Sequence, residues 1–200
     1  MPFRGIRWNM APSTTPHSTG PTATVVAVVG PGSDDALASF DGVAGIDAFT
    51  LRDLEPAIGT RRIAASAAQW VVHDADPLEH VAAAWVELFE ERSTLGVLEA
   101  EVDAALDAFN DGDMVMPDYY VVLDPEVADP TWRHWWCGAL AHRAPRRILP
   151  FSAPGHADDI ALRRMLNALP TSRPWPEPAQ WLRHLPFEIP DRVGLRDGNA

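Results

Sequence analysis

The stretch TVVAVV at residues 24–29 runs directly into GPGSDD at residues 30–35. A short run of mostly β-branched residues is typical of a strand that is buried on both faces, as in a parallel sheet. The turn and the short helical pattern at residues 34–40, with Ser33 or Asp34 as its expected N-cap, complete a strand–loop–helix unit. Residues 70–77 (WVVHDADP) and 119–126 (YYVVLDPE) repeat the change from an apolar run to an acidic loop.

Outward from this unit, predicted strands and helices alternate along the chain. That alternation favours a parallel sheet with helices on both faces. We therefore predict a single three-layer α/β domain, flavodoxin-like or Rossmann-like, with a mostly parallel sheet of about 4–5 strands. The expected strands are residues 24–29, 46–51, 69–73, 118–123 and 147–151; the expected helices are residues 34–40, 77–89, 95–109, 129–142, 157–169 and 178–184; residues 58–68 fit either a loop or a short helix.

The two ends of the chain differ from its centre in composition. Residues 1–22 are rich in Ser, Thr and Pro and lack periodicity, so we predict a disordered leader. Residues 23–169 form the predicted α/β domain. Residues 170–200 hold several prolines together with Trp175 and Trp181. We expect this tail to pack on the domain, with a partner-binding peptide as the alternative.

Composition limits the class of protein. A chain of 200 residues with 46% apolar residues suits one globular domain. The single cysteine, Cys137, excludes an intramolecular disulfide and favours a reducing compartment. No apolar run approaches the ~20 residues of a membrane span, so we expect a cytoplasmic protein without a membrane partner. A net charge of −12 argues against a nucleic-acid partner.

Carboxylates follow two of the predicted strands. Asp74 and Asp76 come after the strand at 69–73, and Asp124 comes after the strand at 118–123. Oxygen ligands near one sheet edge are what Mg²⁺ prefers. Asp74, Asp76 and Asp124 are therefore the candidate metal set, and Mg²⁺ is the one cofactor the sequence suggests. The alternative is ordinary turn and capping chemistry before proline.

Residues 25–37 (VVAVVGPGSDDAL) and 71–77 (VVHDADP) together resemble a Toprim domain. That family has one strand that ends in Glu-Gly and a later strand that ends in D-x-D. Asp74 and Asp76 match the D-x-D positions, whereas Val29 stands where the family has its Glu. The resemblance implies a degenerate acidic site for Mg-dependent phosphoryl-transfer or phosphoesterase chemistry.

The glycine loop after the first strand is a second candidate site. Backbone N–H groups at such a loop can hold an anion, although the loop matches neither G-x-G-x-x-G nor a Walker A sequence. Ser152 follows the last strand and is expected at the same edge. The candidate ligand-binding residues are Gly30, Gly32, Ser33, Asp34 and Ser152.

The sequence WRHWWCG at residues 132–138 places three tryptophans within one and a half helical turns. They cannot all face one core, so we expect Trp135 or Trp136 to face another layer, the tail, a ligand or a partner chain. With the tail tryptophans, the candidate partner-binding residues are Trp135, Trp136, Trp175 and Trp181.

No complete catalytic set is recognisable, and the catalytic residues stay unknown. The favoured hypothesis is a non-catalytic binding or protein-interaction module, whose partner is another protein or a second copy of the chain. The first alternative is the Mg-dependent enzyme with a Toprim-like site. The second is a nucleotide-sensing domain that binds at the glycine loop.

Overall fold

The computed structural model describes residues 23–152, 159–170 and 175–187. Its centre is a five-stranded sheet in the order β2-β3-β1-β4-β5, and every neighbouring pair of strands is parallel. The strands are β1 (Thr24–Val29), β2 (Ile46–Phe49), β3 (Trp70–His73), β4 (Tyr119–Leu123) and β5 (Ile148–Phe151).

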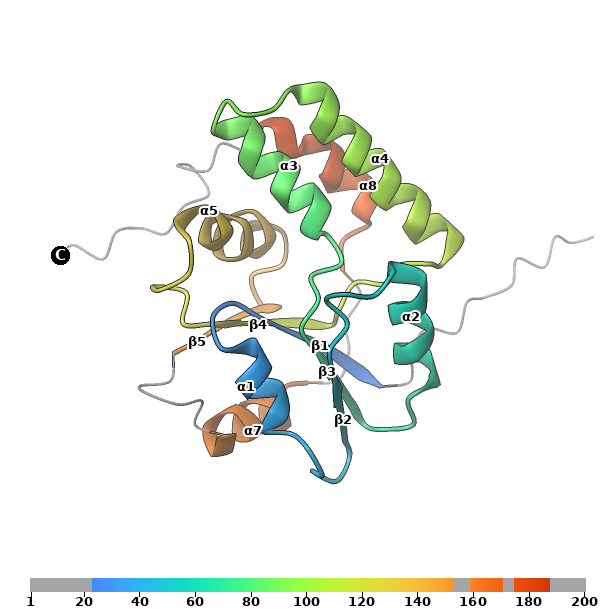
Figure 1. Cartoon of the computed structure of the whole chain (residues 1–200), viewed down its shortest axis with the longest axis vertical. Helices are drawn as coiled ribbons and strands as arrows, with labels where there is room; N and C mark the ends of the chain where they lie inside the picture. Colours follow the sequence, from blue (N-terminus) through green and yellow to red (C-terminus); the bar gives the residue numbers. More distant parts are fainter. Residues whose placement is uncertain (1–22, 153–158, 171–174, 188–200) are drawn as a thin grey trace, which may run out of the picture.

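Helices cover both faces of the sheet (Figure 1). On one face lie α1 (Ser33–Ala38) and α7 (Asp159–Ala168). On the other lie α2 (Pro56–Ala65), α3 (Glu79–Phe89), α4 (Leu95–Asp111), the continuous rod of α5 (Pro130–Arg133), η1 (His134–Leu140) and α6 (Ala141–Arg143), and the tail elements α8 (Pro178–Trp181) and η2 (Leu182–Phe187). The three-layer α/β class is thus confirmed.

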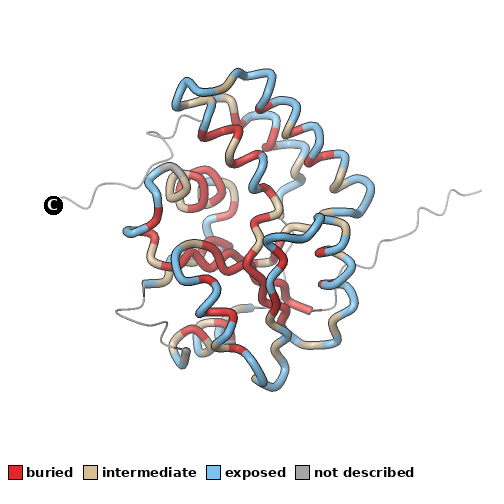
Figure 2. The backbone as a smooth tube through the Cα atoms, viewed as in Figure 1, coloured by how far each residue is buried: buried red, intermediate tan, exposed pale blue. Residues whose placement is uncertain are grey.

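The central strand β1 shows why the sheet needs two helical layers. All six of its residues are buried, and the strands form the buried centre of the molecule in Figure 2. Val26 and Val28 join the core beneath α1 and α7, whereas Ala27 and Val29 join the core beneath α3 and α4. Because successive side chains point to opposite faces that are both buried, the strand is apolar from Val25 to Val29.

The tail elements α8 and η2 cover the core on the side of α3 and α4. Trp181, Leu182 and Leu185 are buried in the same cluster as α3 and α4. The indole N–H of Trp85 donates to the carbonyl of Leu185 at 3.2 Å. On the surface, Arg183 pairs with Asp103 of α4 at 2.8 Å. These contacts fix residues 175–187 against the domain.

Local structure decides one open alternative and departs from the sequence predictions elsewhere. Residues 58–68, for which the sequence allowed a loop or a short helix, lie mostly in a regular helix, α2. Strand β2 ends at Phe49 instead of residue 51. The predicted helix 129–142 is interrupted by the π-helical segment η1. The predicted leader, residues 1–22, lies outside the described residues. Within the described ranges, no helix is long and apolar enough to cross a membrane.

Candidate functional site

A pocket of about 480 Å³ opens at the carboxyl ends of β1 and β3. We call it the strand-end pocket. The loops after the neighbouring strands β1 and β4 lead to helices on opposite faces of the sheet, and the pocket lies at this point. Open α/β sheets typically bind ligands at such a position. Its lining is residues 29–34, Arg52, Asp74, Asp76, Glu79, residues 127–129, Trp132 and Trp136.

The glycine loop forms one wall of this pocket, and Gly30 sets its course. Gly30 has φ +100°, and a Cβ there would lie 2.6 Å from the carbonyl oxygen of Leu123 on β4. Only glycine fits this close approach of two backbones. The helix after the loop is capped by Gly32, in a left-handed conformation and without a side-chain hydrogen bond. The expected cap at Ser33 or Asp34 is therefore wrong.

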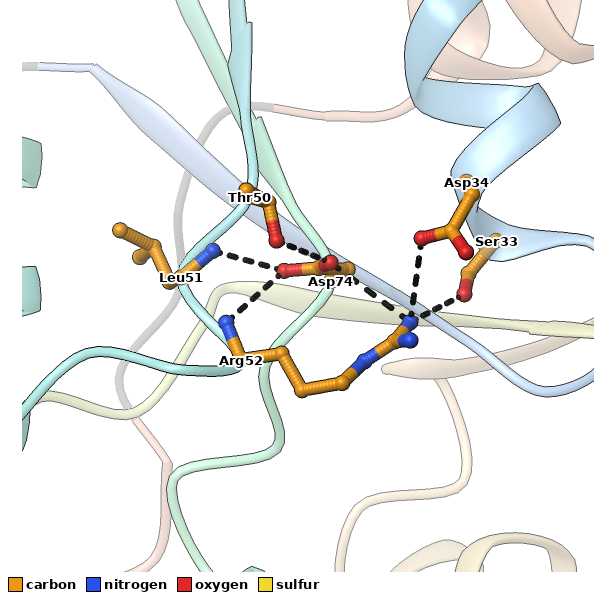
Figure 3. Close-up of polar contacts among 6 residues, drawn as sticks. All are labelled: Ser33, Asp34, Thr50, Leu51, Arg52 and Asp74. Atoms are coloured by element: carbon orange, nitrogen blue, oxygen red, sulfur yellow. Dashed lines mark hydrogen bonds and ion pairs between the residues drawn. The ribbon is translucent and has the colours of Figure 1, made fainter.

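Asp74 holds the loop that follows β2 (Figure 3). Its carboxylate accepts hydrogen bonds from Thr50 Oγ1 at 2.5 Å, from the Leu51 amide at 2.7 Å and from the Arg52 amide at 3.2 Å. Burial raises the pKa of Asp74, but these hydrogen bonds and the Arg52 charge outweigh burial and lower the pKa below its ordinary value. Asp74 is thus an ionised carboxylate that positions Arg52.

The guanidinium of Arg52 links three parts of the pocket (Figure 3). Its Nη2 donates to Ser33 Oγ at 2.7 Å and lies 3.5 Å from both Asp34 Oδ1 and Asp74 Oδ2. The side chain of Asp34 is 78% exposed, so that pair is solvated and weak. Arg52 therefore ties the loop after β2 to the loop after β1.

Asp76 is the buried centre of a second polar network. Its Oδ1 accepts from the Leu78 amide at 3.0 Å and from the Tyr120 hydroxyl at 2.8 Å. Its Oδ2 accepts from the indole N–H groups of Trp135 and Trp136, both at 3.0 Å. Burial raises the pKa of Asp76, and the four donors offset only part of that effect. Burial and the adjacent Asp76 also raise the pKa of Tyr120 well above its ordinary value.

The π-helical segment explains how two consecutive tryptophans reach one oxygen. A π turn is wider than an α turn and changes which residues share a face. Trp135 is fully buried. The expectation that Trp135 or Trp136 faces another layer, the tail, a ligand or a partner stays a prediction. Trp136 is 8% exposed and lines the pocket. The centroid of its ring lies 5.4 Å from the centroid of the Trp132 ring, at an interplanar angle of 32°. The aromatic wall is Trp132 and Trp136.

The pocket lining holds more acidic than basic side chains. The lining residues carry one guanidinium, that of Arg52, and five carboxyl groups. The carboxyl groups belong to Asp34, Asp74, Asp76, Glu79 and Asp129. An acidic lining beside two indole rings attracts a cation and repels an anion.

The candidate metal set is only partly brought together. Asp74 and Asp76 both line the strand-end pocket, whereas Asp124 does not. Hydrogen bonds already engage both oxygens of Asp74 and of Asp76. In the part of the chain that the structure describes, no three His, Cys, Asp or Glu side chains are grouped to hold a metal ion. Mg²⁺ stays a prediction from the sequence.

Of the other candidate residues, some line the strand-end pocket and some do not. Gly30, Gly32, Ser33 and Asp34 line the pocket, whereas Ser152 is exposed at the end of β5 and does not. Trp175 donates its indole N–H to the Pro117 carbonyl at 2.6 Å, and Trp181 is 2% exposed. Both tail tryptophans thus pack within the chain, and a partner surface on them stays a prediction.

Sequence reasoning missed four charged or aromatic lining residues: Arg52, Glu79, Asp129 and Trp132. Arg52 follows β2 at the same edge as the acidic loops, so the strand-end rule could have found it. Trp132 was visible in the WRHWW stretch, but a regular helix gave no reason to choose it over Trp135.

Comparison of the chain with protein-family models, curated protein sequences and solved structures gave no match. The Toprim resemblance therefore rests on its two short stretches. Those stretches do lie on neighbouring parallel strands, β1 and β3. The side chain at the position of the family's Glu is Val29, which is 4% exposed and apolar.

Proposed function

We propose that this protein is a binding domain whose strand-end pocket receives a small planar ligand with a positive charge. This proposal narrows the favoured sequence hypothesis of a non-catalytic binding module to a small-molecule ligand. The observation that carries it is the combination of an aromatic wall with five lining carboxyl groups against one guanidinium. The volume of about 480 Å³ lies within the ~300–1,000 Å³ of small-molecule sites.

The aromatic wall is pre-organised. The Trp136 indole is fixed by its hydrogen bond to Asp76, and the Trp132 ring packs against it. A cation over an indole face gains roughly 0.5–2 kcal/mol, depending on how far it is desolvated. A rigid wall also reduces the entropy lost when a ligand is ordered. These features support a ligand that stacks on the aromatic wall.

The alternatives from the sequence have less support. An Mg-dependent enzyme needs carboxylate oxygens that are open to a cation, and those of Asp74 and Asp76 are engaged. Nucleotide sensing places phosphates beside an acidic lining whose one cation, Arg52, is already paired. A protein partner or self-association, like a cytoplasmic location, stays a prediction of the sequence.

Calorimetric titration with benzamidine, a planar amidinium cation, tests the proposal. We expect Trp132→Ala to weaken benzamidine binding roughly tenfold, since it removes one indole face from the wall. Phe187→Ala is the matched control, because Phe187 is an aromatic residue that is 81% exposed and outside the pocket lining. Equal affinities of the two variants would contradict the assignment of the wall.

A further inference from the structure

A second, smaller cavity adjoins the strand-end pocket on the side of helix α2. Its volume is about 110 Å³, and we call it the α2 cavity. Apolar side chains make up most of its walls, among them Leu51 and Val115. Arg52, Asp76 and Glu79 line both cavities, so they form the boundary between them. A ligand group at this boundary lies beside both cavities.

The boundary is open on its outer side. Glu79 is exposed, and the side chain of Arg52 is 44% exposed, whereas Asp76 is 8% exposed. Exposed side chains change rotamer within picoseconds to nanoseconds. A ligand can therefore extend from one cavity into the other past Glu79 while the buried network around Asp76 stays in place.

Most acidic groups of the strand-end pocket are already engaged. Both oxygens of Asp74 and of Asp76 accept hydrogen bonds from the chain. Asp34 Oδ1 lies 3.5 Å from Nη2 of Arg52. Asp129 also takes part in an interaction within the chain. A ligand cation at any of these groups would compete with an existing contact.

Glu79 differs from the other four acidic residues. It is the first residue of α3, and its side chain makes no hydrogen bond or ion pair with another described residue. Pairing with a ligand therefore breaks no contact in the described part of the chain. A carboxylate accepts two parallel N–H bonds from a planar cation, the geometry that the arginine guanidinium uses. Glu79 is thus the best partner for the charged group of a planar ligand.

The α2 cavity suits an apolar group beside that charge. Each methyl group that leaves water for apolar walls adds to the affinity of a ligand. For scale, a cavity of roughly 150 Å³ accepts benzene, so about 110 Å³ suits a smaller group such as isopropyl. The charged group at the boundary and the apolar walls next to it together describe one kind of ligand.

We propose that the strand-end pocket and the α2 cavity together bind a planar cation whose charged group carries a short alkyl substituent. The charged group pairs with Glu79, the ring lies against Trp132 and Trp136, and the alkyl substituent enters the α2 cavity. This ligand class, an aromatic compound with an N-alkylated amidinium or guanidinium group, rests on the function proposed for the strand-end pocket and narrows it.

Calorimetry with the full chain compares benzamidine with two isomers, N-isopropylbenzamidine and 4-isopropylbenzamidine. Both isomers have the same charge and the same alkyl group, which lies beside the charge in the first and opposite to it in the second. We expect the N-isopropyl isomer to bind about tenfold more tightly than benzamidine and the 4-isopropyl isomer to gain less than about threefold. Equal affinities of the isomers, or tighter binding of the 4-isopropyl isomer, would overturn the proposal.

Glu79→Gln tests the charge pairing, because it keeps the shape of the side chain and removes its charge. We expect it to weaken benzamidine binding about tenfold. Asp34→Asn is the matched comparison and should weaken binding no more than about twofold, since Asp34 is solvated and already paired. Wild-type benzamidine affinity in Glu79→Gln would refute the pairing.

Gly59→Ala tests the place of the alkyl substituent. The added Cβ would lie 3.6 Å from Leu51 Cδ1, an ordinary contact between two residues that line the α2 cavity. The methyl group takes up space there, so we expect a smaller advantage of N-isopropylbenzamidine over benzamidine. An unchanged advantage would refute the use of this cavity.

Benzoate separates the two possible failures. If wild-type protein binds benzamidine no more tightly than benzoate, the function proposed for the strand-end pocket fails. If benzamidine binds more tightly than benzoate but the two isopropyl isomers bind equally, the cation site stands and the alkyl substituent in the α2 cavity is wrong.

Discussion

Trp136 donates its indole N–H to Oδ2 of Asp76 at 3.0 Å, across 60 residues of sequence. This bond fastens the π-helical segment to the loop after β3. Trp136 also lines the strand-end pocket. The acidic loop and the tryptophan-rich stretch, which are separate features of the sequence, therefore belong to one site.

Asp76→Asn tests the structural role of this buried carboxylate. The amide keeps the shape but turns an N–H₂ group toward donors that need an acceptor. We expect a loss of about 3 kcal/mol in the free energy of unfolding, measured with urea. Asp47→Asn on the exposed surface of β2 is the control and should change stability by less than ~0.5 kcal/mol. Similar stabilities of the two variants would contradict the network.

His73 predicts a pH dependence of stability. Its pKa is about 4 in the folded chain and near 6.5 when unfolded. The unfolded chain therefore takes up the proton first, so this contribution is complete above pH 6.5 and is lost as the pH falls toward 4. The gap between the two pKa values corresponds to roughly 3 kcal/mol, at about 1.4 kcal/mol per unit.

His73→Phe isolates this contribution, because the other titrating groups are common to both proteins. Urea unfolding at several pH values between 7 and 4 should show wild type losing more stability than the variant, by roughly 2–3 kcal/mol. Parallel stability curves for the two proteins would mean that His73 is not held neutral.

Gly30→Ala tests the close approach of β1 to β4. The new Cβ would lie 2.6 Å from the Leu123 carbonyl oxygen at a φ of +100°. Gly112→Ala is a matched control, because Gly112 also has positive φ (+77°) but nothing within 4 Å of its Cβ position. We expect the control to cost about 1 kcal/mol and Gly30→Ala at least about 2 kcal/mol more. Equal costs in thermal unfolding would show that the contact is not tight.

Arg52→Gln distinguishes a cation site from an anion site. The substitution removes the one positive charge of the lining, so we expect benzamidine to bind about fivefold more tightly at low salt. High salt should reduce this gain in benzamidine affinity, because it screens the charges of the lining. Calorimetry measures the change, with circular dichroism as a check that the variant is folded. Weaker benzamidine binding in Arg52→Gln would favour an anionic ligand instead.

Much of the fold could be predicted because it depends on local patterns. TVVAVV predicts β1 with its observed ends, since a nearly continuous apolar run is typical of a strand that is buried on both faces. The sequence did not distinguish helix α2 from a loop, because Gly59 weakens the helical pattern. In the structure Gly59 is buried against Leu51, so tertiary packing decides that helix.

The candidate site was harder to predict for a physical reason. Asp74 and Asp76 were singled out as metal ligands, and they do lie at the pocket. Their oxygens, however, accept hydrogen bonds from Thr50, Trp135 and other groups that are distant in sequence. Trp132 was passed over because a regular α-helix does not show which tryptophan a π turn will place in the pocket. Neither the hydrogen bonds to these oxygens nor the place of Trp132 can be read from spacing along the chain.

The most direct test of the central claim is the charge preference of the strand-end pocket. Benzamidine and benzoate have nearly the same planar shape and opposite charges, so calorimetry with wild-type protein compares charge alone. The acidic lining and the tryptophan wall predict that benzamidine binds at least about tenfold more tightly than benzoate. Equal affinities, or tighter binding of benzoate, would contradict the claim that this pocket receives a planar cation.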